Sequence, residues 1–226
     1  MYEDRRSDEP KDGEPPAPIG RAHLGDDLGR IISLSDGVFA FALTLLVLTL
    51  VVPTVDTSGP ASAVSSRLGA KLGSDWQEFL GYAFAFVMIG LWWMIHHRTF
   101  RYIRRYDQIL MWLNMLVLLE IAVMPFILSV FTTYSYTQVG VALFAFMQLV
   151  TGLTLNLIWR YAARNHRFID ATLPEAEIRY FANRGILPAV AFGLSIAVTF
   201  VNVNLAELLW FVPVVLNRFS DRYGVV

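Results

Sequence analysis

The stretch RIISLSDGVFAFALTLLVLTLVVP, residues 30–53, joins a long apolar run to an acidic residue. Its second half is apolar enough to enter a bilayer, whose hydrocarbon core is crossed by about 20 helical residues. Its first half carries Arg30, Ser33, Ser35 and Asp36. An aspartate at membrane depth costs roughly 2.5–3.5 kcal/mol on insertion scales. Asp36 is therefore expected to face protein or water and to have a partner.

The composition of the chain indicates an integral membrane protein. Of its 226 residues, 55% are hydrophobic and 16% are charged, and soluble domains have roughly 25% charged residues. The apolar runs predict an all-α membrane protein with one domain over residues 26–220, preceded by a polar, disordered tail at 1–25. Six transmembrane helices are expected, at 30–52, 76–97, 107–131, 138–161, 180–202 and 204–218. The absence of cysteine excludes disulfides, thiolate metal sites and cysteine nucleophiles.

The longest expected loop, residues 53–75, contains a short amphipathic pattern. Val64, Leu68 and Leu72 recur every four residues, with Arg67 and Lys71 beside them. This spacing predicts a short helix that lies either at the membrane interface or over the spans.

The distribution of basic residues predicts the orientation. Every Lys and Arg except Arg67 and Lys71 falls in the N-terminal segment, the connections 2–3 and 4–5, or the C-terminal end. Cytoplasmic loops carry the excess of Lys and Arg. Both termini are therefore expected in the cytoplasm, which also agrees with an even number of spans.

The first span divides into two faces on a helical wheel. An arc about 100° wide collects mostly apolar positions, namely Leu34, Gly37, Phe41, Thr44, Leu45 and Leu48. Ser35 and Asp36 lie away from this arc. The cytoplasmic end of the second span, GLWWMIHHRTF, offers indole and imidazole N–H donors for a buried carboxylate. We expect a structural cluster that fixes the rotation of the first span, made of Arg30, Ser35, Asp36, Trp93, His96 and His97.

The paired histidines, His96 and His97, also raise the question of a metal. Adjacent residues on a helix point about 100° apart, and no cysteine and few acidic residues are near enough in the sequence to complete a site. An interfacial pair is the better interpretation, and no fixed metal site is expected.

At this point the residues match a known pattern. Arg30, Leu34, Ser35 and Asp36, followed by GVFAFALTLLVL, resemble the Arg-x-x-x-Phe-Ser-Asp signature of the transmembrane protein 175 potassium-channel family, in its prokaryotic branch. FLGYAFAFVMIGLWWMIHHRTF and WLNMLVLLEIAVMPF resemble the second and third helices of that branch. The resemblance implies a homotetramer in a prokaryotic plasma membrane, with the first helix of each subunit lining a central pore. It implies conduction of K⁺ in preference to other monovalent cations, with no enzymatic activity, no cofactor and no nucleic-acid partner.

The same resemblance implies the pore residues. The family's apolar constriction falls on Phe41, Leu45 and Leu48, and its selectivity threonine falls on Thr44; the TVGYG carbonyl filter is absent. Two positions depart from the family pattern. Leu34 replaces the signature phenylalanine, and Phe41 stands where isoleucine or leucine is expected. Four phenyl rings near an axis either tighten or close the pore, turn aside, or offer their faces to a cation.

Two other functional classes compete with a channel. A secondary transporter usually shows internal repeats and broken helices, and neither is visible. An intramembrane enzyme needs a nucleophile and base at depth, for which Asp36 with His96 or His97 is the only candidate. Glu120, deep in the third span, is either protonated or paired with Asn114 or a residue of another span.

Overall fold

The computed structural model describes residues 21–213 and 215, and this part of the chain is built from helices. The long helices are α1 (Arg21–Leu45), α3 (Trp76–Tyr102), α4 (Gln108–Tyr134), α5 (Gln138–Ala163) and α6 (Glu175–Thr199). The shorter ones are α2 (Ala61–Ser74), α7 (Val203–Leu208) and the 3₁₀ turns η1 (Leu46–Thr49), η2 (Arg164–His166) and η3 (Leu209–Phe211). Strand-like pairing within these residues is limited to one bridge between Ile103 and Ile169.

Five helices in the described residues are long and apolar enough to cross a membrane, and they fall on the first five expected spans. The all-α membrane fold is therefore confirmed. The expected sixth span, 204–218, coincides with α7 and η3, which turn back along α6; residues 216–218 lie outside the described part of the chain. The helix α1 begins at Arg21, within the segment expected to be a disordered tail.

The C-terminal end of the first span comes earlier in the chain than the sequence predicts. The chain tightens to a 3₁₀ helix at Leu46 and leaves helical geometry at Leu50, which is extended (φ −78°, ψ 117°). A helix to about residue 52 was expected, and the observed helix ends three residues earlier, at Thr49. The physical reason is Pro53, because proline disfavours the α conformation in the residue before it; two β-branched valines precede it.

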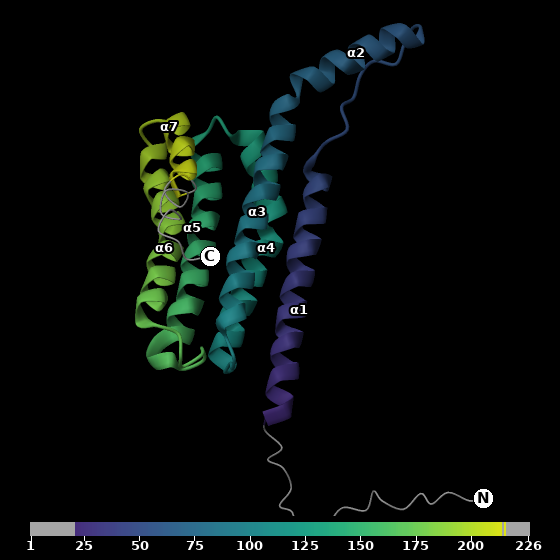
Figure 1. The fold of residues 1–226 in the computed structure, drawn as a ribbon. Helices are drawn as coiled ribbons and strands as arrows, with labels where there is room; N and C mark the ends of the chain where they lie inside the picture. The colour runs from purple at the N-terminus through teal and green to yellow at the C-terminus, as the bar shows by residue number, and fades with distance from the viewer. Residues whose placement is uncertain (1–20, 214, 216–226) are drawn as a thin grey trace, which may run out of the picture.

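The predicted amphipathic helix in the first loop is present as α2. It projects away from the bundle beyond α1 (Figure 1), and none of its residues is buried. The alternative in which this helix packs over the spans of its own chain is therefore not what the protomer shows. An ion pair of 2.7 Å between Asp56 and Arg67 joins the loop before α2 to this helix.

Side-chain caps and one glycine set the starts of the inner helices. Asp107 accepts a hydrogen bond from the Leu110 amide at the start of α4, and Thr137 does the same for Gly140 at the start of α5. Such caps satisfy amides that have no partner inside the helix. A Cβ atom on Gly140 would lie 2.4 Å from the carbonyl oxygen of Tyr134, so the turn between α4 and α5 requires glycine.

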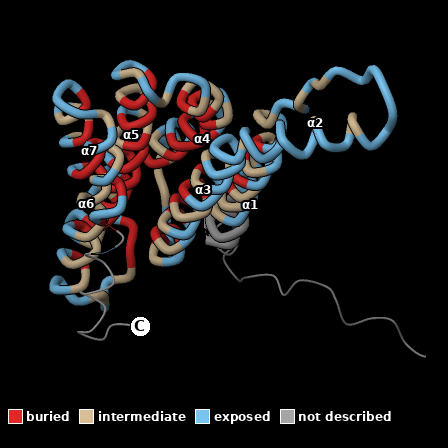
Figure 2. The backbone as a smooth tube through the Cα atoms, turned by 90° about the horizontal axis from the view of Figure 1, so that it is seen from above, coloured by how far each residue is buried: buried red, intermediate tan, exposed pale blue. Residues whose placement is uncertain are grey.

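The helices are arranged with α5, α6 and α7 on one side, α3 and α4 in the middle, and α1 at the far edge (Figure 1). Buried residues concentrate on α4 and α5, whereas α2 is exposed and α1 is mostly intermediate or exposed (Figure 2). In the most apolar part of each span, 56% of residues are buried in α5 but 22% in α1. The first span is therefore the least covered by its own protomer.

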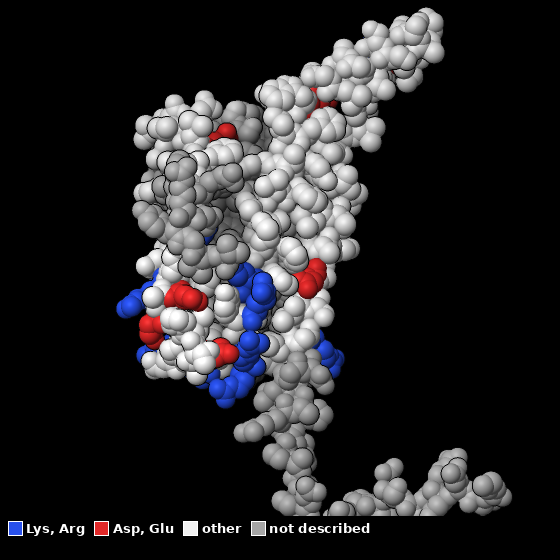
Figure 3. Space-filling view, in the orientation of Figure 1, with Lys and Arg blue, Asp and Glu red and all other residues white. Residues whose placement is uncertain are grey.

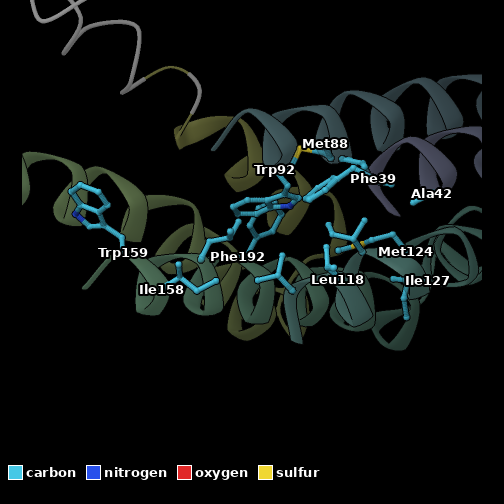
Figure 4. Packing of buried hydrophobic residues seen from close by; sticks show 14 of the residues in the cluster. Phe39, Ala42, Met88, Trp92, Leu118, Met124, Ile127, Ile158, Trp159 and Phe192 are labelled. Carbon is cyan, nitrogen blue, oxygen red and sulfur yellow. The ribbon is translucent and has the colours of Figure 1, made fainter. Parts of the chain in front are cut away.

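Aromatic packing joins helices α3, α4 and α5 to the turn η3. The rings of Phe84, Phe131 and Trp210 surround that of Phe144 at centroid distances of 5.9, 4.9 and 5.0 Å, joining α3, α4, α5 and η3. Closer to the end of the bundle that carries the arginine-rich connections, Trp92 donates to Gln148 at 2.5 Å. Figure 4 shows Trp92 together with Phe39 and Met88 in the buried cluster.

The two connections rich in arginine are tied to each other at one end of the bundle. The Arg104 amide donates to the Phe168 carbonyl at 2.7 Å, next to the Ile103–Ile169 bridge. Asp107 accepts from the Tyr161 hydroxyl at 2.6 Å and from Arg167 at 3.1 Å. Lys and Arg gather at this end of the visible face (Figure 3), as expected for the cytoplasmic side of a membrane protein.

Candidate pore-lining helix and its anchor

The inner face of α1 and of the turn η1 that continues it packs against α4 and α3 through fully buried positions. Ser35, Phe39, Ala42 and Leu46 are each at most 2% exposed. They recur at spacings of three and four residues, which places them on one side of the helix. The opposite face of α1, which includes Leu34, Phe41 and Thr44, is exposed in the protomer.

Asp36 is anchored to α3 by a side-chain hydrogen bond. The indole N–H of Trp93 donates to Asp36 Oδ1 at 2.8 Å, and the Trp93 ring stacks on His97 with centroids 5.4 Å apart. The carboxylate thus has the partner that its depth in the first span requires. The structure brings Asp36, Trp93 and His97 together.

Ser35 and His96 meet through a residue that the sequence cluster did not contain. Asn114 on α4 donates through Nδ2 to Ser35 Oγ at 3.0 Å, and its Oδ1 lies 2.8 Å from His96 Nε2. With Nδ2 turned to the serine, Asn114 Oδ1 can only accept, so His96 Nε2 is the donor. A polar residue inside the apolar run WLNML was the signal for this site, although Asn114 had been considered as a partner of Glu120.

The other residues expected in the structural cluster are placed differently. Arg30 is exposed and does not join the cluster. His96 is buried against Phe39 and Phe100, while His97 lies on the exposed side. Among the described residues, no group of three or more His, Asp or Glu side chains is placed to hold a metal ion.

Glu120 is a second buried polar group between α4 and α5. It is 4% exposed, and its Oε1 accepts from the Thr154 hydroxyl at 2.8 Å. Its Oε2 is buried without a hydrogen-bond partner. The partner on another span was one of the expected alternatives, and Asn114 is not that partner.

The expected pore-lining positions lie on the open face of α1 and, for Leu48, on the 3₁₀ turn η1 that continues it. Leu34 is 51% exposed, Phe41 64% and Leu48 75%, and Thr44 is also exposed, while Leu45 is intermediate. Such a stripe of apolar side chains without partners marks a contact with lipid, another protein or a pore.

A groove of about 530 Å³ runs along part of this face. Its α1 wall extends from Ser33 to Leu45, and Ala122 of α4 forms the other side. Phe41 and Leu45 line the groove, whereas Thr44 and Leu48 do not. Two of the four residues therefore border the groove and two do not.

The Thr44 hydroxyl is committed to its own helix. Thr44 Oγ1 donates to the Phe41 carbonyl at 2.8 Å. A hydroxyl has one proton and two lone pairs. Because its proton is engaged, the oxygen has its lone pairs left for a group that approaches from outside.

The chain is similar in sequence to known potassium channels. Residues 30–125 match the family model described as endosomal/lysosomal potassium channel TMEM175. A potassium channel of Streptomyces collinus is 30% identical over 184 residues, which is 80% of this chain and 86% of that one. A potassium channel of Chamaesiphon minutus is 30% identical over 191 residues, 81% of this chain and 91% of that one.

A solved structure agrees with these sequence matches. The crystal structure of a lysosomal potassium-selective channel TMEM175 homolog from Chamaesiphon minutus superimposes with a TM-score of 0.71 at 26% identity, covering 88% of this chain and all of that one (100%). The family and these relatives are ion channels and not enzymes. The chain therefore belongs to the TMEM175 family.

Proposed function

We propose that this protein is a potassium-preferring cation channel whose pore is formed where the open faces of several α1 helices meet. The single observation that carries this proposal is the state of α1: its inner face is anchored through Ser35 and Asp36, while its outer face is exposed. An anchored helix with an unpartnered apolar face suits a pore wall. The potassium channels among the relatives support the same function.

The constriction is formed by Phe41, Leu45 and Leu48, with Thr44 as its selectivity layer. A narrow apolar ring opposes ion passage because it holds water poorly. Thr44 oxygens, with their protons directed to the Phe41 carbonyl, offer lone pairs to an ion that has lost part of its hydration shell. K⁺ sheds water at lower cost than Na⁺, so this layer favours K⁺. K⁺ is the permeant ion, and the function requires no cofactor.

The assembly is a homotetramer of six-span subunits in a prokaryotic plasma membrane, with both termini in the cytoplasm. The gathering of Lys and Arg at one end of the described bundle supports this orientation. The low burial of α1 within the protomer supports an assembly in which other subunits cover it.

Flux from proteoliposomes under a K⁺ gradient tests this function. The expected result is electrogenic K⁺ flux that exceeds Na⁺ flux and needs no counter-substrate. Saturable flux coupled to a second ion would instead establish a secondary transporter and overturn the proposal.

A polar substitution in the constriction supplies the matched control. Leu48→Asn is expected to raise flux, because a polar ring holds water and lowers the barrier. Leu153→Asn, at a 44% exposed leucine of α5, is expected to leave flux unchanged. Equal effects of the two variants would place Leu48 outside the conduction path.

A further inference from the structure

Glu120 is the only buried Asp, Glu, Lys or Arg in the described part of the chain, and the proposed pore does not use it. It is 4% exposed and lies near the middle of α4, about 18 Å from the Gln108 end and about 21 Å from the Tyr134 end. A charged carboxylate at this depth is costly unless both of its oxygens have partners. The contacts of Glu120 therefore indicate in which form it is present.

Glu120 has too few hydrogen-bond donors for a charged carboxylate. Its Oε2 is buried without a partner. Its Oε1 lies 2.8 Å from Thr154 Oγ1, but that hydroxyl oxygen also lies 3.0 Å from the Val150 carbonyl oxygen. A hydroxyl has one proton, so Thr154 cannot donate fully to both acceptors. Thr151, the other threonine near this carboxyl group, donates to the Met147 carbonyl at 3.0 Å.

Charged side chains in the described residues do not compensate Glu120, whose environment is set by burial and by the two threonines. The helices that pack against α4 are α1, α3 and α5. On these helices, the titratable side chains closest to the level of Glu120 bond other groups, namely Asp36 to Trp93, His96 to Asn114 and Arg160 to Asn156. An ionised Glu120 would thus be an uncompensated charge inside the helix bundle.

We propose that Glu120 and Thr154 form a proton-binding site between α4 and α5, in which Glu120 is held as a neutral carboxylic acid. The acid proton lies on Oε1 and is donated to Thr154 Oγ1, and Thr154 donates its own proton to the Val150 carbonyl. Each of these protons then has an acceptor. The remaining oxygen, Oε2, is a neutral carbonyl oxygen, which costs less to bury than a charged one.

The bound proton supports the helix that anchors α1. Asn114, which bonds Ser35 of α1, lies on α4 about 9 Å before Glu120. Removal of the proton would place a charge between α4 and α5, so the contact between these helices is expected to weaken under alkaline conditions. The inference does not require α1 to line a pore, and it stands apart from the proposed function.

Infrared spectroscopy of the whole protein in lipid tests the charge of Glu120, because carboxylic acids and carboxylates absorb in separate bands. The spectrum of the natural protein minus that of Glu120→Gln at pH 7 is expected to contain a carboxylic-acid band. Glu78→Gln, at an exposed glutamate at the start of α3, is the matched control and should reveal a carboxylate band. A carboxylate band at Glu120 would overturn the proposal, and one that shifts on addition of K⁺ would identify a cation site instead.

Variants of Thr154 test the hydrogen bond and keep Glu120 in place. Thr154→Val removes the acceptor of the acid proton and is expected to shift the acid band to higher frequency. Thr154→Ser keeps the hydroxyl and should leave the band where it is. An acid band that is the same in the valine variant would contradict the assigned partner, and this result does not depend on whether Glu120→Gln folds.

The pH dependence of stability provides a second measurement. Glu120→Gln keeps the shape of the neutral acid, and its amide can donate to Thr154 as the acid does. An unfolded glutamate ionises near pH 4.3, so above about pH 5 the folded protein binds one proton more than the unfolded chain, and stability falls as pH rises. The unfolding equilibrium constant of the natural protein, relative to that of Glu120→Gln, should rise by about tenfold per pH unit. A ratio that is the same at pH 5 and pH 8 would overturn the proposal.

Discussion

The indole N–H of Trp93 and the carboxylate of Asp36 meet at 2.8 Å and tie the first membrane helix to α3. The bond sits on the side of α1 away from its exposed stripe. It therefore fixes the rotation of the helix, and with it the direction in which Phe41, Thr44 and Leu48 face. The acidic residue in this apolar run therefore serves to position the helix.

Removing either partner of this bond is expected to destabilise the protein by about 1 kcal/mol, because the bond is charge-assisted but partly exposed. Asp36→Ala and Trp93→Phe should cost similar amounts. The double variant should cost little more than either single one, since both remove the same interaction. Thermal unfolding in detergent measures all three, and strictly additive losses would show that the two side chains are not coupled.

The Asn114 site predicts a larger loss. Asn114→Leu leaves His96 without its side-chain partner and Ser35 with only its bond to the Ile31 carbonyl. A buried donor without an acceptor costs about 1–3 kcal/mol, so the melting temperature should fall clearly. The adjacent Met115 is 41% exposed, and Met115→Leu serves as the control. Equal stability of the two variants would contradict a structural role for Asn114.

These two sites show what the sequence was able to predict. Asp36 required a partner because of its cost at depth, and Trp93 was a donor at the same level, so their pairing followed from local chemistry. The link from Ser35 to His96 through Asn114 joins three helices. Its prediction needs the rotations of all three, which hydrophobic patterning defines only coarsely.

The ends of helices show the same limit. The apolar run at 30–52 has the composition of a helix to its last residue, yet the backbone leaves the helix after Thr49. Pro53 was the visible signal, but the apolar run extends up to the residue before it. Likewise, nothing local distinguishes Phe41 and Leu45 from Thr44 and Leu48, because the groove that separates them exists only once α4 is in place.

Close packing between α5 and α6 depends on Gly152. An added Cβ there would lie 3.1 Å from Trp92 Cη2 and 3.2 Å from Ala189 Cβ. Gly152→Val is therefore expected to destabilise the fold by about 1–3 kcal/mol through overpacking. Gly69→Ala, in the open on α2, should be neutral or slightly stabilising. Chemical denaturation compares the two, and a tolerated valine at 152 would contradict this packing.

The contacts of Asp107 with Tyr161 and Arg167, at the arginine-rich end of the bundle, predict that stability depends on pH. Partial burial of Asp107 raises the pKa of its carboxyl group. Hydrogen bonds from Tyr161 and the Leu110 amide, together with the charge of Arg167, lower it by more. The pKa of Asp107 therefore lies below its ordinary value of 3.8. The ionised form thus contributes stability that is complete above about pH 4 and is lost as pH falls through the lowered pKa. Asp107→Asn should be less stable than the natural protein at pH 7, and the difference in melting temperature should shrink below about pH 4. A difference that does not change with pH would show that the charge of Asp107 contributes nothing.

Thr44 carries the prediction on selectivity. Its hydroxyl proton is bound to the Phe41 carbonyl, so the oxygen can act toward the pore only as an acceptor, which suits a cation. Thr44→Ala removes this layer of ligands and is expected to lower the K⁺/Na⁺ permeability ratio by about tenfold, equivalent to about 1.4 kcal/mol. Thr44→Ser keeps the oxygen and should keep most of the ratio, which separates coordination from packing. Reversal potentials under bi-ionic conditions measure the ratio, and an unchanged value in the alanine variant would remove Thr44 from the selectivity mechanism.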